Sequence, residues 1–101
     1  MQFLVFASPT VGKEDEFNEW YTGEHIPDML KIPAVTSATR IRLRPVGGTE
    51  KRPEYLTTYE VDGDIDSLIK EIGVRTRNGD FGATSDTLDM SSVRMIAGEP
   101  A

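Results

Sequence analysis

The order of its elements predicts that the chain is an α+β domain with the ferredoxin-like order βαββαβ. Four segments have the composition, or the alternation of apolar and polar residues, that is typical of strands. Two further segments, one after the first strand and one before the last, repeat apolar residues every three or four positions, as amphipathic helices do. This order predicts a four-stranded antiparallel sheet with both helices on one face. The other face is then free to pack against a second copy, so a homodimer is expected.

The first part of the chain predicts a strand followed by a helix. Residues Gln2–Ser8 are rich in Phe, Leu and Val, which is typical of a short buried strand. Turn-forming residues follow at Pro9–Gly12. A helix is predicted over Lys13–Tyr21, because acidic residues crowd its first turn and its aromatic residues lie on one face, namely Phe17, Trp20 and Tyr21.

Two residues predict where this helix ends. Gly23 favours a stop, and Pro27 lacks a backbone N–H and disfavours helical geometry at the residue before it. The helix is therefore expected to break or kink near His25. Pro27 can then open a short second helix over Asp28–Lys31.

The middle of the chain predicts a hairpin of two strands. The segment Ala34–Arg44 alternates, with Val35, Ser37, Thr39, Ile41 and Leu43 on one face and Thr36, Ala38, Arg40, Arg42 and Arg44 on the other. A polar loop, Pro45–Pro53, joins it to a second strand over Glu54–Val61. In that strand the residues Tyr55, Thr57, Tyr59 and Val61 share one face.

The last third predicts a helix, a loop and a final strand. The turn Asp62–Asp64 can cap a helix, and apolar residues at helical spacing predict that helix over Ile65–Val74. Two glycines mark Arg75–Asp86 as a flexible loop. The final strand is predicted over Thr87–Ala97.

Composition limits what this domain can bind. The 101 residues fit a single domain, 1–101, and the formal net charge of −6 argues against nucleic-acid binding and against adhesion to an anionic membrane. The chain has no Cys and one His, which excludes disulfides, zinc–thiolate sites and a two-histidine metal site within one chain. No apolar run is long enough to span a bilayer, so a cytoplasmic protein with neither cofactor nor metal is expected.

The single histidine lies in the most informative stretch of the sequence. His25 follows two aromatic residues, Trp20 and Tyr21, and has the carboxylates of Glu24 and Asp28 nearby. An imidazole can act as a base or an acid near neutral pH, and a carboxylate that accepts its N–H would fix the tautomer. The plainer interpretations are that His25 caps the helix break, that the aromatic residues are core, and that Asp28 only interacts with the helix dipole.

This stretch resembles the EthD-like branch of the dimeric α/β-barrel superfamily. The matching residues are Trp20, Tyr21, His25, Ile26, Pro27 and Asp28, followed by Ile32–Val35 and Ala38–Arg40. The resemblance covers nearly the whole chain, with Ala34 standing where Gly is expected. It implies a ferredoxin-like protomer, a sheet-to-sheet dimer and a cleft between sheet and helices. The superfamily includes monooxygenases without cofactors, isomerases, cyclases, decarboxylases and heme proteins, so fold alone does not settle the reaction.

Three further residues are candidates for substrate binding. Arg40 could hold a substrate carboxylate, although the arginines of this strand could instead pair with Glu54 or Glu60 on its neighbour. Tyr59 could donate a hydrogen bond to a ligand, or could be core. Phe81 could close over a pocket as part of the glycine-containing loop, or could anchor that loop.

Together these residues predict a small enzyme without an organic cofactor. Its reaction would be proton transfer, such as isomerisation, cyclisation, dehydration or decarboxylation, on an oxygenated aromatic, polyketide-like or lactone intermediate. His25 would be the base or acid, Tyr21 a hydrogen-bond partner, and Asp28 or Glu24 the group that orients the imidazole. The alternatives are a ligand-binding or accessory subunit of an oxidoreductase system, and a cofactor-free monooxygenase.

Overall fold

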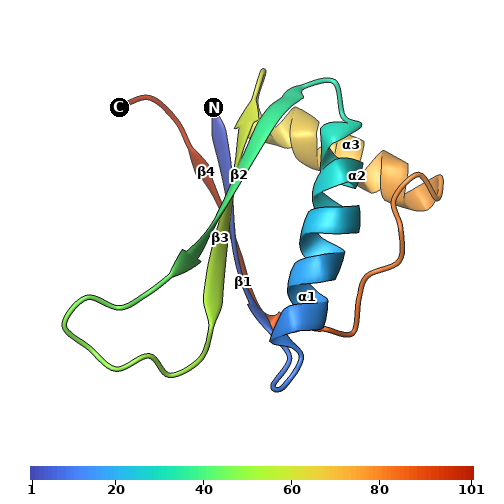
Figure 1. Cartoon of the computed structure of the whole chain (residues 1–101). Helices are drawn as coiled ribbons and strands as arrows, with labels where there is room; N and C mark the ends of the chain where they lie inside the picture. The colour runs from blue at the N-terminus through green and yellow to red at the C-terminus, as the bar shows by residue number, and fades with distance from the viewer.

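The chain folds into a four-stranded antiparallel sheet that is covered on one face by helices (Figure 1). The computed structural model describes all 101 residues. Its elements are β1 (Gln2–Pro9), α1 (Glu14–Trp20), a π-helical turn η1 (Tyr21–His25), α2 (Ile26–Leu30), β2 (Val35–Leu43), β3 (Glu54–Val61), α3 (Ile65–Arg77) and β4 (Leu88–Gly98). The strand order is β2-β3-β1-β4, with all neighbours antiparallel. The predicted ferredoxin-like α+β fold is confirmed.

The helix that follows β1 does not stop at Gly23. It continues from α1 through η1 into α2, with right-handed helical angles at each junction. Within η1 the N–H of Ile26 donates to the carbonyl of Tyr21, which is the wider bond of a π-helical turn. The wide turn accommodates Pro27, which has no N–H to donate. The predicted stop at Gly23 is therefore wrong, and the irregularity that Pro27 predicts takes the form of a π turn.

Two β-bulges change what alternation alone predicts. Between Val35 and Ser37 the register of β2 on β3 shifts, so Val35 is buried under the helices whereas Ile41 faces the other side of the sheet. Alternation places these two residues on one face, and the extra residue of the bulge separates them.

At the N-terminal end of α3, Asp64 accepts a hydrogen bond from the N–H of Ser67, which confirms the predicted cap. The helix runs three residues beyond the predicted end at Val74, to Arg77.

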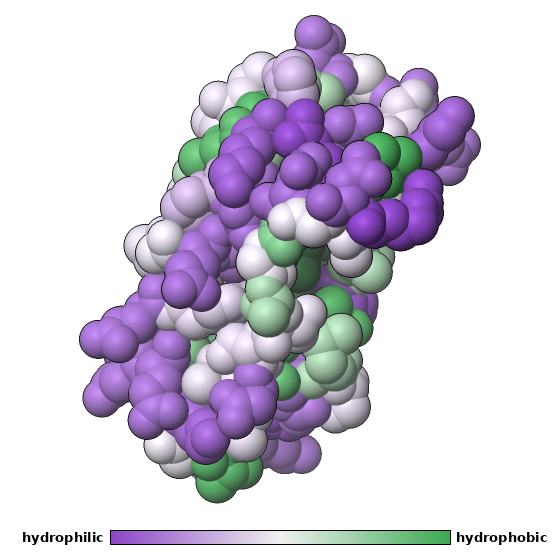
Figure 2. All heavy atoms as spheres, turned by 90° about the vertical axis from the view of Figure 1, so that its right-hand side faces the viewer, coloured by the Kyte–Doolittle hydropathy of each residue, from purple (hydrophilic) through white to green (hydrophobic).

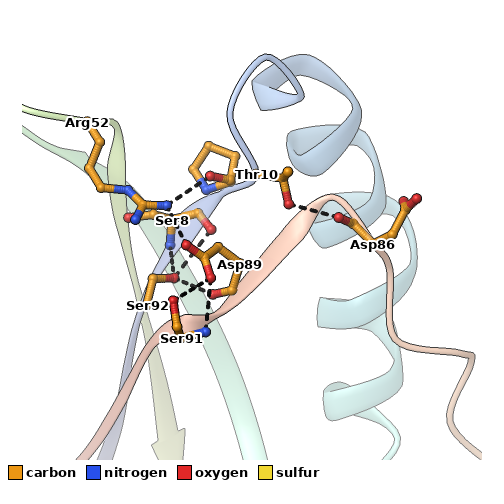
Figure 3. Close-up of polar contacts among 8 residues, drawn as sticks. Ser8, Thr10, Arg52, Asp86, Asp89, Ser91 and Ser92 are labelled. Carbon is orange, nitrogen blue, oxygen red and sulfur yellow. Dashed lines mark hydrogen bonds and ion pairs between the residues drawn. The ribbon is translucent and has the colours of Figure 1, made fainter.

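A polar cluster pins the second bulge, which lies between Phe6 and Ser8 where β1 meets β4 (Figure 3). The Ser92 hydroxyl accepts from the N–H of Ser8 at 2.8 Å and donates to the carbonyl of Asp89 at 2.6 Å. Arg52 pairs with the Asp89 carboxylate at 2.9 Å and also donates to the carbonyl of Pro9. Side-chain and backbone groups of the cluster thus hydrogen-bond to one another, as expected of a structural device.

The core lies between the sheet and the helices, in two clusters. One contains Phe3, Met29 and Tyr59, and the other contains Phe17, Tyr21 and Tyr55. The outer surface over the helices is mainly polar and shows only small apolar groups (Figure 2). The opposite face of the sheet carries a row of partly exposed apolar residues, Leu4, Phe6, Ile41, Leu56 and Ile96. No helix of the chain combines the length and apolar character needed to cross a membrane.

Candidate functional site

An apolar cavity of about 270 Å³ lies between the sheet, the η1–α2 turn and the loop that follows α3. Strands β1 and β4 form its floor, and 14 of its 19 lining residues are hydrophobic. Other hollows of the surface, such as the one beside Arg44 and Glu54, are lined mainly by polar residues. An apolar cavity with a few polar groups is the usual form of a small-molecule site.

The cavity includes six of the seven residues that the sequence predicts for the site. His25, Tyr21, Trp20, Asp28, Tyr59 and Phe81 line it, and Arg40 does not. The lining that the sequence did not identify comes mainly from β1 and β4, with Val5, Met90, Val93 and Met95 as examples. The alternation of Val93 and Met95 along β4 could have indicated them, because residues two apart in a strand share one face.

His25 is half-buried against two aromatic rings. Its ring stacks on that of Trp20 with centroids 5.1 Å apart, and it meets the ring of Tyr21 in an edge-to-face arrangement with centroids 4.8 Å apart. The imidazole takes part in no hydrogen bond of the structure. Burial lowers the pKa of His25, and the charge of Asp28 offsets only part of that effect. The imidazole is therefore neutral at pH 7, with one ring nitrogen free to accept a proton.

The carboxylate of Asp28 makes its hydrogen bonds to residues other than His25. One carboxylate oxygen accepts from the Lys31 ammonium and the other accepts from the N–H of Gly82, each at 2.8 Å. These hydrogen bonds, that of Lys31 first, lower the pKa of Asp28. Neither oxygen makes the expected hydrogen bond to the imidazole. Glu24 is exposed and makes no hydrogen bond to His25 either.

Asp28 instead holds the loop that covers the cavity. Lys31 adds a second link by donating to the carbonyl of Asp80 at 3.3 Å. Between these two anchors lies Phe81, which packs on the core and lines the cavity. Both interpretations of Phe81 therefore describe the same position, since it anchors the loop and forms part of the cavity wall.

Tyr21 and Tyr59 close the cavity on the side of β3. Their exposed fractions are 2% and 0%, and neither hydroxyl has a hydrogen-bond partner. Burial raises the pKa of both phenols, so they stay protonated at neutral pH. The predicted helix face is thus divided between core and cavity: Phe17 is core, whereas Trp20 and Tyr21 reach the cavity.

Arg40 lies behind these tyrosines. Its guanidinium carbon is 4.3 Å from the centre of the Tyr55 ring and 4.7 Å from that of Tyr21. It donates to the side-chain oxygen of Asn18 at 2.7 Å and forms no ion pair. The pairing with Glu54 or Glu60 is not observed, because Arg40 and Arg42 face the helices rather than those side chains; Arg42 binds Glu14 and Glu50.

No group of three or more His, Cys, Asp or Glu side chains converges in a way that could hold a metal ion. The polar groups at the cavity are an imidazole, two phenols and, at the rim, one carboxylate that is already occupied by two donors. This set can accept a proton and can hydrogen-bond an oxygen. It suits an organic ligand with an apolar body.

The comparisons with known proteins agree with this fold. No protein-family model and no curated protein sequence matches the chain. Its structure is similar to the crystal structure of an ethyl tert-butyl ether D (EthD) family protein from Bacillus halodurans C-125, with a TM-score of 0.63 and 18% sequence identity over 100% of this chain and 99% of that one. An identity this low shows the fold alone. The chain therefore has the fold of an EthD family protein, as its resemblance to that family predicts.

Proposed function

We propose that the chain is a small enzyme that transfers protons without an organic cofactor. Its substrate would be an oxygenated aromatic, polyketide-like or lactone intermediate, and the reaction an isomerisation, cyclisation, dehydration or decarboxylation. The observation that carries the proposal is a neutral imidazole, free of hydrogen bonds, at the wall of an apolar cavity. Such a group can take a proton from a bound ligand near neutral pH.

The dimensions of the cavity support a compact, mostly flat ligand. Its volume of about 270 Å³ lies just below the range of about 300–1,000 Å³ that is usual for small-molecule sites. The rings of Trp20 and Tyr21 provide flat apolar walls on the helix side. The methionines on the side of β4 can adapt to irregular shapes. One or two fused rings bearing oxygen would suit this lining.

One observation favours a second candidate, a protein that binds such a ligand without converting it. No carboxylate hydrogen-bonds the imidazole of His25, because Asp28 is held by Lys31 and Gly82. An efficient general base normally has a partner that fixes its tautomer. In the enzyme that we propose, the ligand itself or a bound water must supply that partner.

The unoccupied face of the sheet supports a homodimer. Its apolar residues, Leu4, Phe6, Ile41, Leu56 and Ile96, lie in adjacent rows across all four strands. Two such faces would bury each other as in a β-sandwich. The cavity lies on the opposite, helix-covered side, so this pairing would leave it open. Sedimentation that showed only an 11 kDa monomer at micromolar concentration would exclude this dimer.

The test begins with a thermal-shift screen of aromatic acids, phenols, lactones and polyketide fragments, followed by turnover assays on the hits. A ligand at 100 times its dissociation constant should stabilise the wild type by about 2.7 kcal/mol. The variant His25→Gln should still bind the hits but turn them over about 10²–10⁴-fold more slowly. The matched control Glu24→Gln, at an exposed neighbour, should behave as the wild type.

Each outcome separates the candidates. Turnover that is unchanged in His25→Gln would overturn the proposed role of the imidazole. Tight binding without turnover of any hit would favour the binding protein. Oxygen consumption during turnover would indicate the monooxygenase alternative instead of simple proton transfer.

A further inference from the structure

Unsatisfied buried polar atoms gather at one end of the cavity. Four buried side-chain nitrogen or oxygen atoms of the chain form no hydrogen bond, and one of them, the Nη1 of Arg42, is satisfied by its ion pair with Glu50 at 2.9 Å. Three of them are the hydroxyls of Tyr21 and Tyr59 and the Nε of Arg40. An unpartnered buried polar group is costly, so three in one place need an explanation, such as a ligand that supplies the missing partner.

The sheet places these groups in line with the cavity. Arg40 on β2 pairs in register with Thr57 on β3, Thr57 with Val5 on β1, and Val5 with Met95 on β4. This row runs from a half-buried cation at one edge of the sheet to an exposed methionine at the other. Val5 and Met95 of this row line the cavity whereas Thr57 and Arg40 do not, and the ring of Tyr21, which also lines the cavity, contacts the guanidinium.

Arg40 carries a charge that no carboxylate balances. Three aromatic rings surround the guanidinium, those of Phe17, Tyr21 and Tyr55, and its hydrogen-bond acceptor is the neutral amide of Asn18. A carboxylate near this cluster, that of Glu14, accepts from Tyr55 at 2.6 Å and pairs with Arg42. A half-buried cation without a counter-charge favours any anion that comes close to it.

The two phenols lie between that charge and the ligand. The guanidinium carbon of Arg40 lies 4.7 Å from the centre of the Tyr21 ring, and its charge opposes the rise in pKa that burial causes at both Tyr21 and Tyr59. Thr57 and the two hydroxyls are neighbours, although none is placed with the geometry of a hydrogen bond. Because burial keeps both phenols protonated, each has an O–H that it can donate.

We propose that the inner end of the cavity recognises one anionic oxygen of the ligand, an enolate or phenolate, through the hydroxyls of Tyr21 and Tyr59, with Arg40 behind them as a positioning residue that supplies the charge. This inference rests on the proposed function and deepens it, because it names the ionised form that the site stabilises. In the unliganded chain both hydroxyls are enclosed, so the ligand oxygen reaches them as the two rings move apart.

The chemistry balances with His25 as the base. A C–H bond next to a ligand carbonyl breaks, its proton goes to the imidazole nitrogen, and its electron pair forms a C=C bond while the carbonyl oxygen becomes the enolate oxygen. Two O–H donors and a cation near that oxygen stabilise the charge as it develops. No oxidant or second reactant is needed.

The test uses 4-nitrophenol as the probe, because its ionised and neutral forms absorb differently. Binding is followed by the fluorescence of Trp20, the one tryptophan of the chain, which lines the cavity. The pKa of the bound probe is then measured by absorbance. An apolar cavity alone would raise it above the value in water, whereas O–H donors and a nearby cation lower it. We expect a lowering of about one unit, a tenfold change in the acid dissociation constant.

The variants assign the effect to residues. Tyr21→Phe, Tyr59→Phe and Arg40→Gln should each raise the pKa of the bound probe, and Arg40→Lys should restore part of the lowering. Arg44→Gln removes the same charge from an exposed site nearby and should have no effect. His25 and Asp28 also border the cavity, so the titration is repeated in His25→Gln to remove the contribution of the imidazole. Circular dichroism confirms that each variant is folded.

The outcomes distinguish this inference from the proposed function. A probe that binds with an unchanged or raised pKa would overturn the inference and leave the role of His25 intact. An effect of Arg40→Gln no larger than that of Arg44→Gln would remove Arg40 from it. If 4-nitrophenol leaves Trp20 fluorescence unchanged up to the highest concentration that dissolves, the cavity does not bind a phenolate and this inference is overturned, whereas the role of His25 is still decided by the turnover assays. Should Arg40→Gln not fold, the two Tyr→Phe variants and Arg40→Lys decide.

Discussion

The two ends of the cavity differ in how deeply their residues are buried. The inner end consists of Tyr21 and Tyr59, which sit on a helix and a central strand and are 2% and 0% exposed. The outer end consists of Met90 and Met95 on an edge strand, which are 63% and 60% exposed, together with the loop around Phe81. Packing on all sides holds the inner end in place. The loop at the outer end is held by a few hydrogen bonds from Asp28 and Lys31.

This difference separates recognition from access. Polar groups enclosed in a packed core can discriminate between ligand oxygens, because only an oxygen that hydrogen-bonds to both hydroxyls offsets the cost of moving the two rings apart. Flexible methionines and a tethered loop can admit ligands of several shapes. Changes at the inner end should therefore alter stability and the kind of ligand bound. Changes at the outer end should alter how readily a ligand enters and leaves.

The largest effect is expected at Tyr59, where ring and hydroxyl can be tested apart. Tyr59→Ala removes a fully buried ring from the core and should lower the free energy of unfolding by about 3–5 kcal/mol. Tyr59→Phe removes only a hydroxyl that lacks a partner, so its effect on stability should be near zero or slightly favourable. Urea denaturation measures both values. A loss of more than about 2 kcal/mol in Tyr59→Phe would show that this hydroxyl is satisfied in solution.

A smaller effect is expected where Asp28 tethers the loop. Asp28→Ala removes the acceptor for the N–H of Gly82 and the partner of Lys31, and should cost about 1–2 kcal/mol because the carboxylate is only 14% exposed. Asp28→Asn keeps an acceptor for Gly82 and should cost less. Hydrogen exchange at the Gly82 amide should speed up in Asp28→Ala and change little in Asp28→Asn. Equal exchange in both variants would mean that the loop is held by Phe81 alone.

The inner end could be predicted from the sequence further than the outer end. Strand alternation correctly groups Tyr55, Thr57, Tyr59 and Val61, and the strand β3 begins and ends as predicted. Helical spacing brings Trp20, Tyr21 and His25 together. These patterns are local, and burial on one face enforces them.

The remaining features depend on contacts between distant parts of the chain. The π turn at Tyr21–His25 carries the helix past Gly23 and Pro27, a solution that propensity alone does not indicate. Asp28 is close to His25 in the sequence, but its carboxylate accepts a hydrogen bond from the N–H of Gly82, which is 54 residues further along the chain. The sequence predicts Arg40 as a ligand for a substrate carboxylate, yet the rings of Tyr21 and Tyr55 cover its guanidinium. Each of these outcomes required knowledge of the tertiary packing.

His25, midway between the two ends, should make stability depend on pH. Burial lowers its pKa in the folded state, so the unfolded chain takes up a proton first as the pH falls. The stability associated with the neutral imidazole is fully present above the unfolded value of about 6.5 and is lost as the pH falls from there through the lower folded value. Urea denaturation at several pH values between about 8 and 5 should therefore show a decline in the wild type.

The variant His25→Gln isolates this contribution. Its stability should change less over the same pH range, because no group titrates at position 25. The carboxylates whose pKa is lowered by hydrogen bonds, such as Asp28 and Asp64, lose their contribution only below their ordinary value of about 4, outside this window. Parallel curves for the two proteins would mean that His25 is as well solvated in the folded chain as in the unfolded one.

The smallest effect on stability is expected at the outer end, at Met90. Because this side chain is 63% exposed, Met90→Ala should change the free energy of unfolding by less than about 0.5 kcal/mol. Its loss should nevertheless widen the mouth of the cavity and speed both association and dissociation of 4-nitrophenol, measured by stopped-flow fluorescence of Trp20. Tyr59→Phe should do the reverse, keeping the rates of entry while weakening the hold on the ionised oxygen. If Met90→Ala instead changes the pKa of the bound probe and Tyr59→Phe does not, the ligand oxygen lies at the mouth and the assignment of the two ends is inverted.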